Sequence, residues 1–213
     1  IFAAFGMTDV GTTLMDFVTG YLYNMLYIAF PCVFLIILAN RLVAKYVDNG
    51  SMAYILAVPE KRRKIVITQA VFLVCCLFIM VAYITGLILF VSHLMFPKEL
   101  NTAEFLRVNV GLLGVLVFIG GACFLFSCLF NETRLSTGIG TGIVVYSILA
   151  QMLARVGDKF EALKYATPLT LYDVEGLIAM ERNAWICCAV LYACGLLFLA
   201  VGCTAFSKRN LPI

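Results

Sequence analysis

Five long apolar runs fill most of this chain, and each is long enough to cross a lipid bilayer. The runs cover residues 22–44, 65–95, 105–130, 136–154 and 184–206. A membrane-spanning helix needs roughly 20 mostly apolar residues, whereas the strands of a membrane barrel show shorter segments of alternating polarity. Because backbone groups in lipid must be satisfied within the segment, the sequence predicts an all-α, polytopic bundle of transmembrane helices.

The composition supports the same class. The chain is 63% hydrophobic and 13% charged, whereas soluble domains carry about 45–50% apolar and about 25% charged residues. A soluble fold of 213 residues cannot bury this much apolar surface. We therefore expect residues 1–213 to form one transmembrane domain in contact with the lipid bilayer.

Basic residues are concentrated on one side of the predicted bundle. If the loop at residues 45–64 faces the cytoplasm, alternation of the spans places residues 131–135 and the C-terminal tail there too. The basic residues of this side are Arg41, Lys45, Lys61, Arg62, Arg63, Lys64, Arg134, Lys208 and Arg209. Those of the opposite side are Lys98, Arg107, Arg155, Lys159, Lys164 and Arg182. The positive-inside rule therefore puts the 45–64 loop in the cytoplasm, and the charge pattern gives no indication of nucleic-acid binding.

This orientation leaves residues 1–20 on the outer side. The stretch begins at Ile1 and lacks the basic region and cleavage site of a signal peptide. We expect a further span upstream, so that five of six spans are present in this sequence. The alternative is a five-span protein with a translocated N-terminal tail.

Catalytic and metal-binding patterns are missing. Nine cysteines lie within the apolar runs without a CxxC pair, and His93 is the single histidine, whereas metal sites need clustered ligands. No carboxylate pair lies within the spans, although transporters driven by protons or sodium usually need such a group. We expect no catalytic residue, metal or cofactor on this chain, and energy for any transport to come from elsewhere.

Glycines in two of the spans predict close helix contacts. Residues 138–142 look like a phosphate loop, but no Lys-Ser or Lys-Thr pair follows them. Small residues at helical spacing instead let two membrane helices approach each other. The glycines expected at such contacts are Gly111, Gly114, Gly120, Gly121, Gly138 and Gly142.

A compact loop follows the first span. Gly50 ends the helix, Ser51 can cap a short helix that is apolar along one face, and Pro59 stops it. Two interpretations stay open: an ordinary interfacial helix, or a docking helix for a cytoplasmic partner. The residues of this segment are Ser51, Met52, Ala53, Tyr54, Ile55, Leu56, Ala57, Val58 and Pro59.

The loop resembles that of ABC-2 type permeases. That family shows an acidic residue and Gly-Thr, then Leu-Leu-Ala-x-Pro, then a basic pair before the next span. Here residues 50–63 read Gly-Ser-Met-Ala-Tyr-Ile-Leu-Ala-Val-Pro-Glu-Lys-Arg-Arg. Ser51 replaces the usual Thr, and Asp48 stands near the usual acid.

Two later motifs extend the resemblance over nearly the whole chain. Residues 165–173 are similar to the family's Ser-Pro-hydrophobic segment before the last span. Residues 206–211 resemble its terminal Phe-x-x-Arg-Asp-Leu, with Asn210 in place of the acid.

The resemblance implies a type V ABC exporter-like architecture with six spans. Two permeases, a second copy or a paralogue, would sit above two cytoplasmic ABC ATPase subunits that bind ATP-Mg. Residues 51–59 would be the helix that couples to the ATPase, and residues 131–135 a second contact. Residues 155–183 would form an extracellular cap, part helical and partly dipping into the membrane. Tyr165, Tyr172 and Trp185 suit the outer interface. The protein would be a multi-pass component of the bacterial cytoplasmic membrane.

Polar residues within the spans are few, and aromatic residues line them. This favours an amphipathic or lipid-like cargo, such as a peptide, an antibiotic or a lipid. A non-transporting integral membrane protein, such as a membrane-embedded enzyme, a sensor anchor or an assembly factor, is the alternative. The polar residues concerned include Asn24, Gln69, Asn109 and Gln151.

Overall fold

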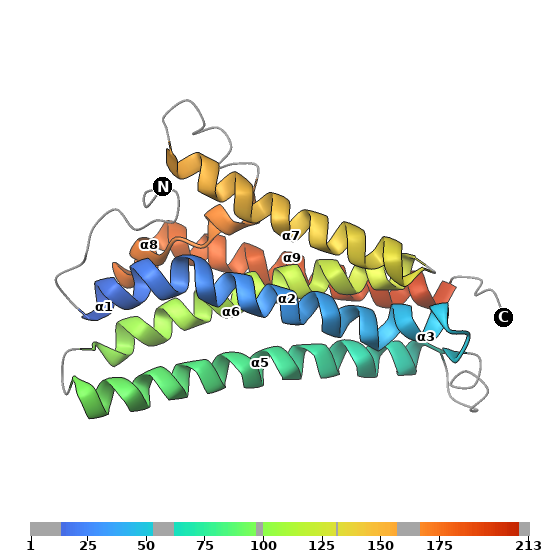
Figure 1. Ribbon diagram of the computed structural model, residues 1–213, viewed down its shortest axis with the longest axis horizontal. Helices are drawn as coiled ribbons and strands as arrows, with labels where there is room; N and C mark the ends of the chain where they lie inside the picture. The colour runs from blue at the N-terminus through green and yellow to red at the C-terminus, as the bar shows by residue number, and fades with distance from the viewer. Residues whose placement is uncertain (1–13, 53–61, 97–99, 131, 157–166, 209–213) are drawn as a thin grey trace.

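The chain folds as a bundle of long helices (Figure 1). The computed structural model describes residues 14–52, 62–96, 100–130, 132–156 and 167–208, and no strand occurs within these ranges. In this part of the chain five helical segments are long and apolar enough to cross a membrane, which confirms the predicted all-helical, multi-pass membrane protein. These segments are Tyr27–Asp48, Arg63–Met95, Thr102–Leu129, Thr133–Leu153 and Arg182–Lys208.

The first spanning segment is a continuous but irregular helix that begins before the apolar run. Two π-helical stretches interrupt its α-helical parts, and Pro31 lies within the middle part. In chain order the parts are α1 (Leu14–Phe17), η2 (Val18–Leu26), α2 (Tyr27–Ala39), η3 (Asn40–Ala44) and α3 (Lys45–Asp48). The helix stops at Gly50, whose φ of 67° lies in the left-handed region that glycine enters without a Cβ penalty. The predicted helix end at this residue is confirmed.

Four further long helices complete the bundle, and one of them lies at its centre. They are α5 (Arg62–Met95), α6 (Thr102–Leu129), α7 (Thr133–Val156) and α9 (Arg182–Lys208). Within α6, 72% of the most apolar 18-residue stretch is buried, against 28% in both α5 and α7. Figure 1 shows α7 diverging from the other helices toward its C-terminal end. Two short elements, η5 (Pro168–Leu171) and α8 (Val174–Ile178), lie before α9.

Helices α6 and α9 form the closest pair in the bundle. A Cβ built on Gly121 would lie 2.5 Å from the carbonyl oxygen of Gly195, and one built on Gly195 would lie 2.8 Å from that of Val117. Small residues recur every seven positions on both helices, and this period lets two helices keep one seam in contact. On α6 they are Gly114, Gly121 and Cys128, and on α9 they are Cys188, Gly195 and Gly202. The absence of side chains at Gly121 and Gly195 allows the two backbones to touch.

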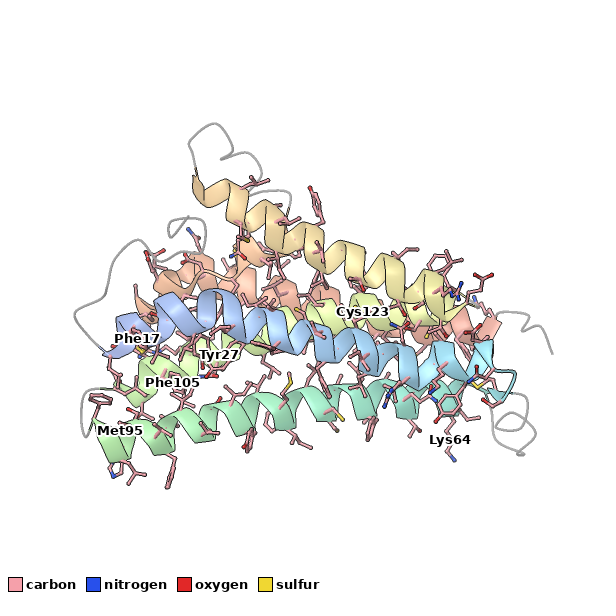
Figure 2. All side chains as sticks on the ribbon, viewed as in Figure 1. Phe17, Tyr27, Lys64, Met95, Phe105 and Cys123 are labelled. Carbon is pink, nitrogen blue, oxygen red and sulfur yellow. The ribbon has the colours of Figure 1, made fainter. Side chains whose placement is uncertain are left out.

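The spans alternate in direction as the charge pattern requires. The ends of α3, α6 and α9 and the starts of α5 and α7 lie at one end of the bundle (Figure 1). Lys64 lies at this end and Met95 at the other (Figure 2). The end that carries Lys64 is called the basic end below.

Candidate functional site

The predicted coupling segment begins with an anchored turn at the basic end. The Ser51 hydroxyl donates a hydrogen bond to the carbonyl oxygen of Tyr46 over 3.3 Å. Met52 is in helical conformation and only 3% exposed, because it packs into the hydrophobic core. Residues 53–59, the rest of the segment, lie outside the described residues. The turn therefore fixes where the loop leaves the bundle.

A buried polar cluster links three spans near the opposite end. The Asn109 side-chain oxygen on α6 accepts hydrogen bonds from the hydroxyls of Tyr23 on η2 and Thr85 on α5, both over 2.8 Å. The Asn109 amide nitrogen donates to the Phe105 carbonyl over 2.8 Å. We call Tyr23, Thr85 and Asn109 the Asn109 cluster. Its central side chain binds neighbours through both its oxygen and its nitrogen.

A second buried polar cluster links three spans toward the basic end. The Ser127 hydroxyl on α6 lies 3.3 Å from the side-chain oxygen of Asn40 on η3 and 3.1 Å from the hydroxyl of Ser136 on α7. Asn40 donates its amide to the Ile36 carbonyl over 2.7 Å. We call Asn40, Ser127 and Ser136 the Ser127 cluster. It gives α7 a polar connection to the rest of the bundle.

The two clusters have a common design. In each, a polar residue of a π-helical stretch of the first span, Tyr23 or Asn40, bonds to α6, and π-helical turns occur often at functional sites. Asn109 and Ser127 are 18 positions apart on α6, which corresponds to about 27 Å of helix, close to the roughly 30 Å of a hydrocarbon core. The clusters thus connect the helices at two levels of the bundle that are about 27 Å apart along α6.

Sequence reasoning found only one member of these clusters, Asn109. Ser127 and Asn40 were missed because a single Ser or Asn in an apolar run does not reveal its partner on another helix. Of the other predicted polar residues, Gln69 and Gln151 are partly buried, and the Asn24 side chain is not described. The Gln69 side-chain oxygen has no hydrogen-bond partner among the described residues.

The described part of the predicted cap packs tightly on α6. The Arg107 guanidinium of α6 donates a hydrogen bond to the carbonyl oxygen of Ile178, the last residue of α8, over 2.9 Å. The Tyr172 hydroxyl donates to the Val108 carbonyl over 3.2 Å. Burial raises the pKa of the Tyr172 phenol well above its usual range, so the phenol stays protonated. The Tyr172 ring is buried, and the outer-interface position expected for it stays a prediction, because burial against α6 does not fix a depth in the membrane.

The predicted glycine contacts divide into two groups. Leu177 and Tyr172 cover Gly111, Tyr192 covers Gly114, and Gly120 and Gly121 are also packed against neighbouring helices. Gly138 and Gly142 on α7 are exposed and have no atom within 4 Å of a built Cβ among the described residues. The close contact predicted for this second group is therefore not made with any described residue.

A comparison with known protein families gives one match. Residues 2–211 match a family described as "protein of unknown function" (DUF2705). The chain belongs to the DUF2705 family. No curated protein and no solved structure matches it.

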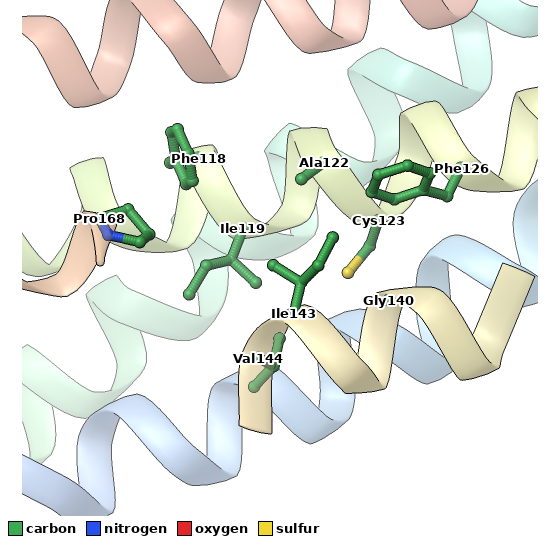
Figure 3. A pocket seen from close by; sticks show the side chains of 9 residues that line it. All are labelled: Phe118, Ile119, Ala122, Cys123, Phe126, Gly140, Ile143, Val144 and Pro168. Atoms are coloured by element: carbon green, nitrogen blue, oxygen red, sulfur yellow. The ribbon is translucent and has the colours of Figure 1, made fainter. Parts of the chain in front are cut away.

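The DUF2705 chain also has an apolar cleft between α6 and α7, closed at one end by η5 (Figure 3). The α6 side is made by two phenylalanines, an isoleucine and two small residues, and the α7 side by a glycine and two β-branched residues. The lining residues are Phe118, Ile119, Ala122, Cys123, Phe126, Gly140, Ile143, Val144 and Pro168. Cys123 is the most polar of them, so the cleft suits hydrocarbon and not a charged group.

Metal and disulfide chemistry finds no support in the described part of this chain. All nine cysteines are reduced thiols. No group of three or more His, Cys, Asp or Glu side chains that could hold a metal ion occurs among the described residues. His93 is exposed in the last turn of α5.

Proposed function

We propose that this DUF2705 protein is the membrane-spanning permease subunit of an ATP-driven ABC transporter in a bacterial cytoplasmic membrane. ATP-Mg binds to separate ATPase subunits, which dock on the basic end. The observation that carries the proposal is the anchored turn at Ser51 and Met52, where the predicted coupling segment leaves the bundle.

A coupling element transmits movement only if its connection to the spans is stiff. Gly50 ends the first span sharply, and Met52, two positions later, is already buried in the core. A flexible loop that merely joins two helices has no need of such a buried anchor. A movement of residues 53–59 that is caused by the ATPase would therefore be transmitted directly to α3 and to the π-helical stretch η3.

The charges support a cytoplasmic position for this end. Positively charged loops stay in the cytoplasm, and an ATPase subunit is available only there. The basic residues of this end whose side chains are described are Arg41, Lys45, Arg63, Lys64, Arg134 and Lys208, and all are exposed.

The cargo passes between two permease copies. The centre of the single chain is filled by α6, and its polar groups in the Asn109 and Ser127 clusters are hydrogen-bonded. A second copy would supply the other wall of a path, and Gly138 and Gly142 offer an open face for it on α7. The apolar outer surface of the spans suits an amphipathic or lipid-like cargo that is exported.

The test is co-purification of an ATPase with the tagged full-length protein. We expect Ala53→Asp or Leu56→Asp to abolish ATPase binding. A carboxylate on the apolar face of the docking helix would lose its hydration where that face contacts the ATPase, and this loss opposes binding. Ala53→Ser, which keeps the size and adds no charge, should bind normally, and all variants should insert into the membrane.

Two results would reject the proposal. One is an aspartate variant that retains its ATPase with full transport-linked ATP turnover. The other is a wild-type protein that carries no ATPase when it is purified from its own membrane, which would favour a non-transporting role.

A further inference from the structure

We infer that the π-helical stretch η3 is a joint at which the first span can change its register by one residue. In the present form Val47 of α3 lies in the core. When η3 tightens into an α-helix, Tyr46 takes the place of Val47, and the turn at Ser51 moves with α3. The joint belongs to the chain alone, so its test can fail while the proposed function stands.

The backbone of η3 holds one residue more than an α-helical turn. The Lys45 amide bonds to the carbonyl oxygen of Asn40, five positions earlier, whereas an α-helical bond spans four positions. Regular α-helix precedes the stretch in α2 and follows it in α3. A π-helical turn within an α-helix is rare and is found mostly at functional sites. Backbone hydrogen bonding therefore favours the tighter, α-helical form.

Side-chain contacts on both sides of η3 hold the present register. At its start, the Asn40 side chain is hydrogen-bonded to Ser127 of α6 over 3.3 Å. Beyond its end, Val47 and Met52 are 8% and 3% exposed and belong to the hydrophobic core. The extra residue lies between these two anchors. Packing thus favours the π form and backbone bonding the α form, so the stretch has two competing states.

The sequence of α3 is compatible with the second register. An α-helix turns by about 100° and rises about 1.5 Å per residue, so when η3 tightens, each residue of α3 takes the place of the next one. Tyr46, now 40% exposed, enters the buried place of Val47, and Val47 enters the exposed place of Asp48. The opposite shift would bury the Asp48 carboxylate. Because Ser127 holds Asn40, the movement affects the basic end and leaves α2 in place.

Removal of one residue tests whether η3 holds the extra one. Deletion of Leu42 should leave both anchors in place with continuous α-helix between them, so the midpoint of thermal unfolding in detergent should change little. Deletion of Leu197 is the matched control, because α9 is α-helical throughout and Gly202, farther along, would lose its place against α6. That variant should lose cooperative unfolding. Equal losses in both deletion variants would overturn the joint.

A carboxylate at position 47 tests whether the full-length chain changes register. Val47→Asp puts a charge into the core in the present register, but the full-length chain can move it to the exposed place of Asp48. The chain without Leu42 has no extra residue and cannot make this shift. Val47→Asp should therefore lower the unfolding midpoint less in the full-length chain than in the deletion chain. An equal fall in both chains would overturn the register change.

Cysteine labelling locates the side chains directly. The nine native cysteines lie within the spanning segments, so the wild-type protein is the blank for a charged maleimide. Val47→Cys should react at roughly 0.1–10% of the rate of Tyr46→Cys, in line with the population of a minor state. Adding Val47→Asp to Tyr46→Cys should protect position 46 in the full-length chain but not in the chain without Leu42. A position 46 that stays equally reactive in both chains would overturn the inference.

Discussion

Helices α7 and α9 both pack against α6, yet they use their glycines in opposite ways. On α9, Gly195 touches the backbone of α6, with its built Cβ 2.8 Å from the Val117 carbonyl oxygen. On α7, Gly138 and Gly142 are exposed and meet nothing within 4 Å among the described residues. The α9 glycines stabilise the fold of one chain, whereas the α7 glycines leave a smooth face that no described residue covers.

The difference shows that spacing alone does not assign a glycine to an interface. Small residues help membrane helices to associate because backbones can then approach closely. Whether the approaching helix belongs to the same chain depends on the rest of the bundle. Because α6 already has α9 on one side and α2 on another, α7 meets it through Gly140 and Ser136 and turns Gly138 and Gly142 outward.

The largest effect is expected at the α6–α9 contact. Gly195→Leu should destabilise the chain by more than about 3 kcal/mol, because the new side chain meets backbone atoms that cannot move aside. Unfolding in detergent, followed by loss of helical circular dichroism, measures the effect. Gly142→Leu makes the same chemical change in open space and is the matched control, with an expected change of less than about 0.5 kcal/mol. Equal destabilisation by both variants would contradict the distinction between the two helices.

The second prediction uses the open face of α7. Gly142→Leu should leave the single chain folded but weaken the pairing of two permeases about tenfold, equivalent to about 1.4 kcal/mol. Native mass spectrometry across a concentration series measures the paired fraction. Leu197→Ala, on the exposed face of α9, is the control and should pair normally. Unchanged pairing in Gly142→Leu would place the partner on another face.

Much of this fold could be predicted from local sequence. Apolar runs locate the spanning helices because helix length and bilayer thickness are tied together, and Gly50 marks the end of the first span through its own backbone freedom. These properties depend on neighbours in sequence. The sequence analysis could therefore predict that the spans exist and in which order they alternate.

The candidate site could be predicted only in part, because its contacts join distant positions. The bond between Asn40 and Ser127 spans 87 positions, and that between Tyr23 and Asn109 spans 86. Asn, Ser and Tyr are common residues, and the local sequence pattern does not indicate which of these side chains will contact one another. The cleft beside Pro168 likewise depends on the direction in which α7 diverges from α6, which tertiary packing decides.

The third prediction concerns the polar connection of α7. Ser127→Ala removes the bonds to Asn40 and Ser136 and should cost about 0.6 kcal/mol, the average for hydrogen bonds between membrane helices. The loss should be local, so hydrogen exchange should quicken in α7 and stay unchanged in α9. Ser147→Ala is the control, because among the described residues Ser147 bonds only to the Ile143 carbonyl of its own helix. Faster exchange in α9 as well would mean that the Ser127 cluster supports the whole bundle.

The smallest effect is expected where α9 begins. A Schellman turn ends α8, since the Glu181 amide donates to the Gly176 carbonyl over 2.8 Å and the Met180 amide points to the Leu177 carbonyl over 3.4 Å. This turn holds Met180 at a φ of 58°, a conformation that costs a residue with a Cβ roughly 1–2 kcal/mol. Met180 is exposed, so its side chain gives little packing in return.

Met180→Gly should therefore stabilise the chain by about 0.5 kcal/mol, because relief of the backbone strain exceeds the roughly 0.5–1 kcal/mol of extra entropy that glycine loses. The midpoint of thermal unfolding in detergent measures the gain. Met180→Ala shortens the side chain but keeps the Cβ, so it should give no gain. If both variants stabilised the chain equally, the cause would be removal of an exposed methionine and not the backbone. If Met180→Gly destabilised the chain, the Met180 side chain would be what stabilises the turn. Side-chain packing would then fix the start of α9, as it does at the glycine contacts farther along this helix.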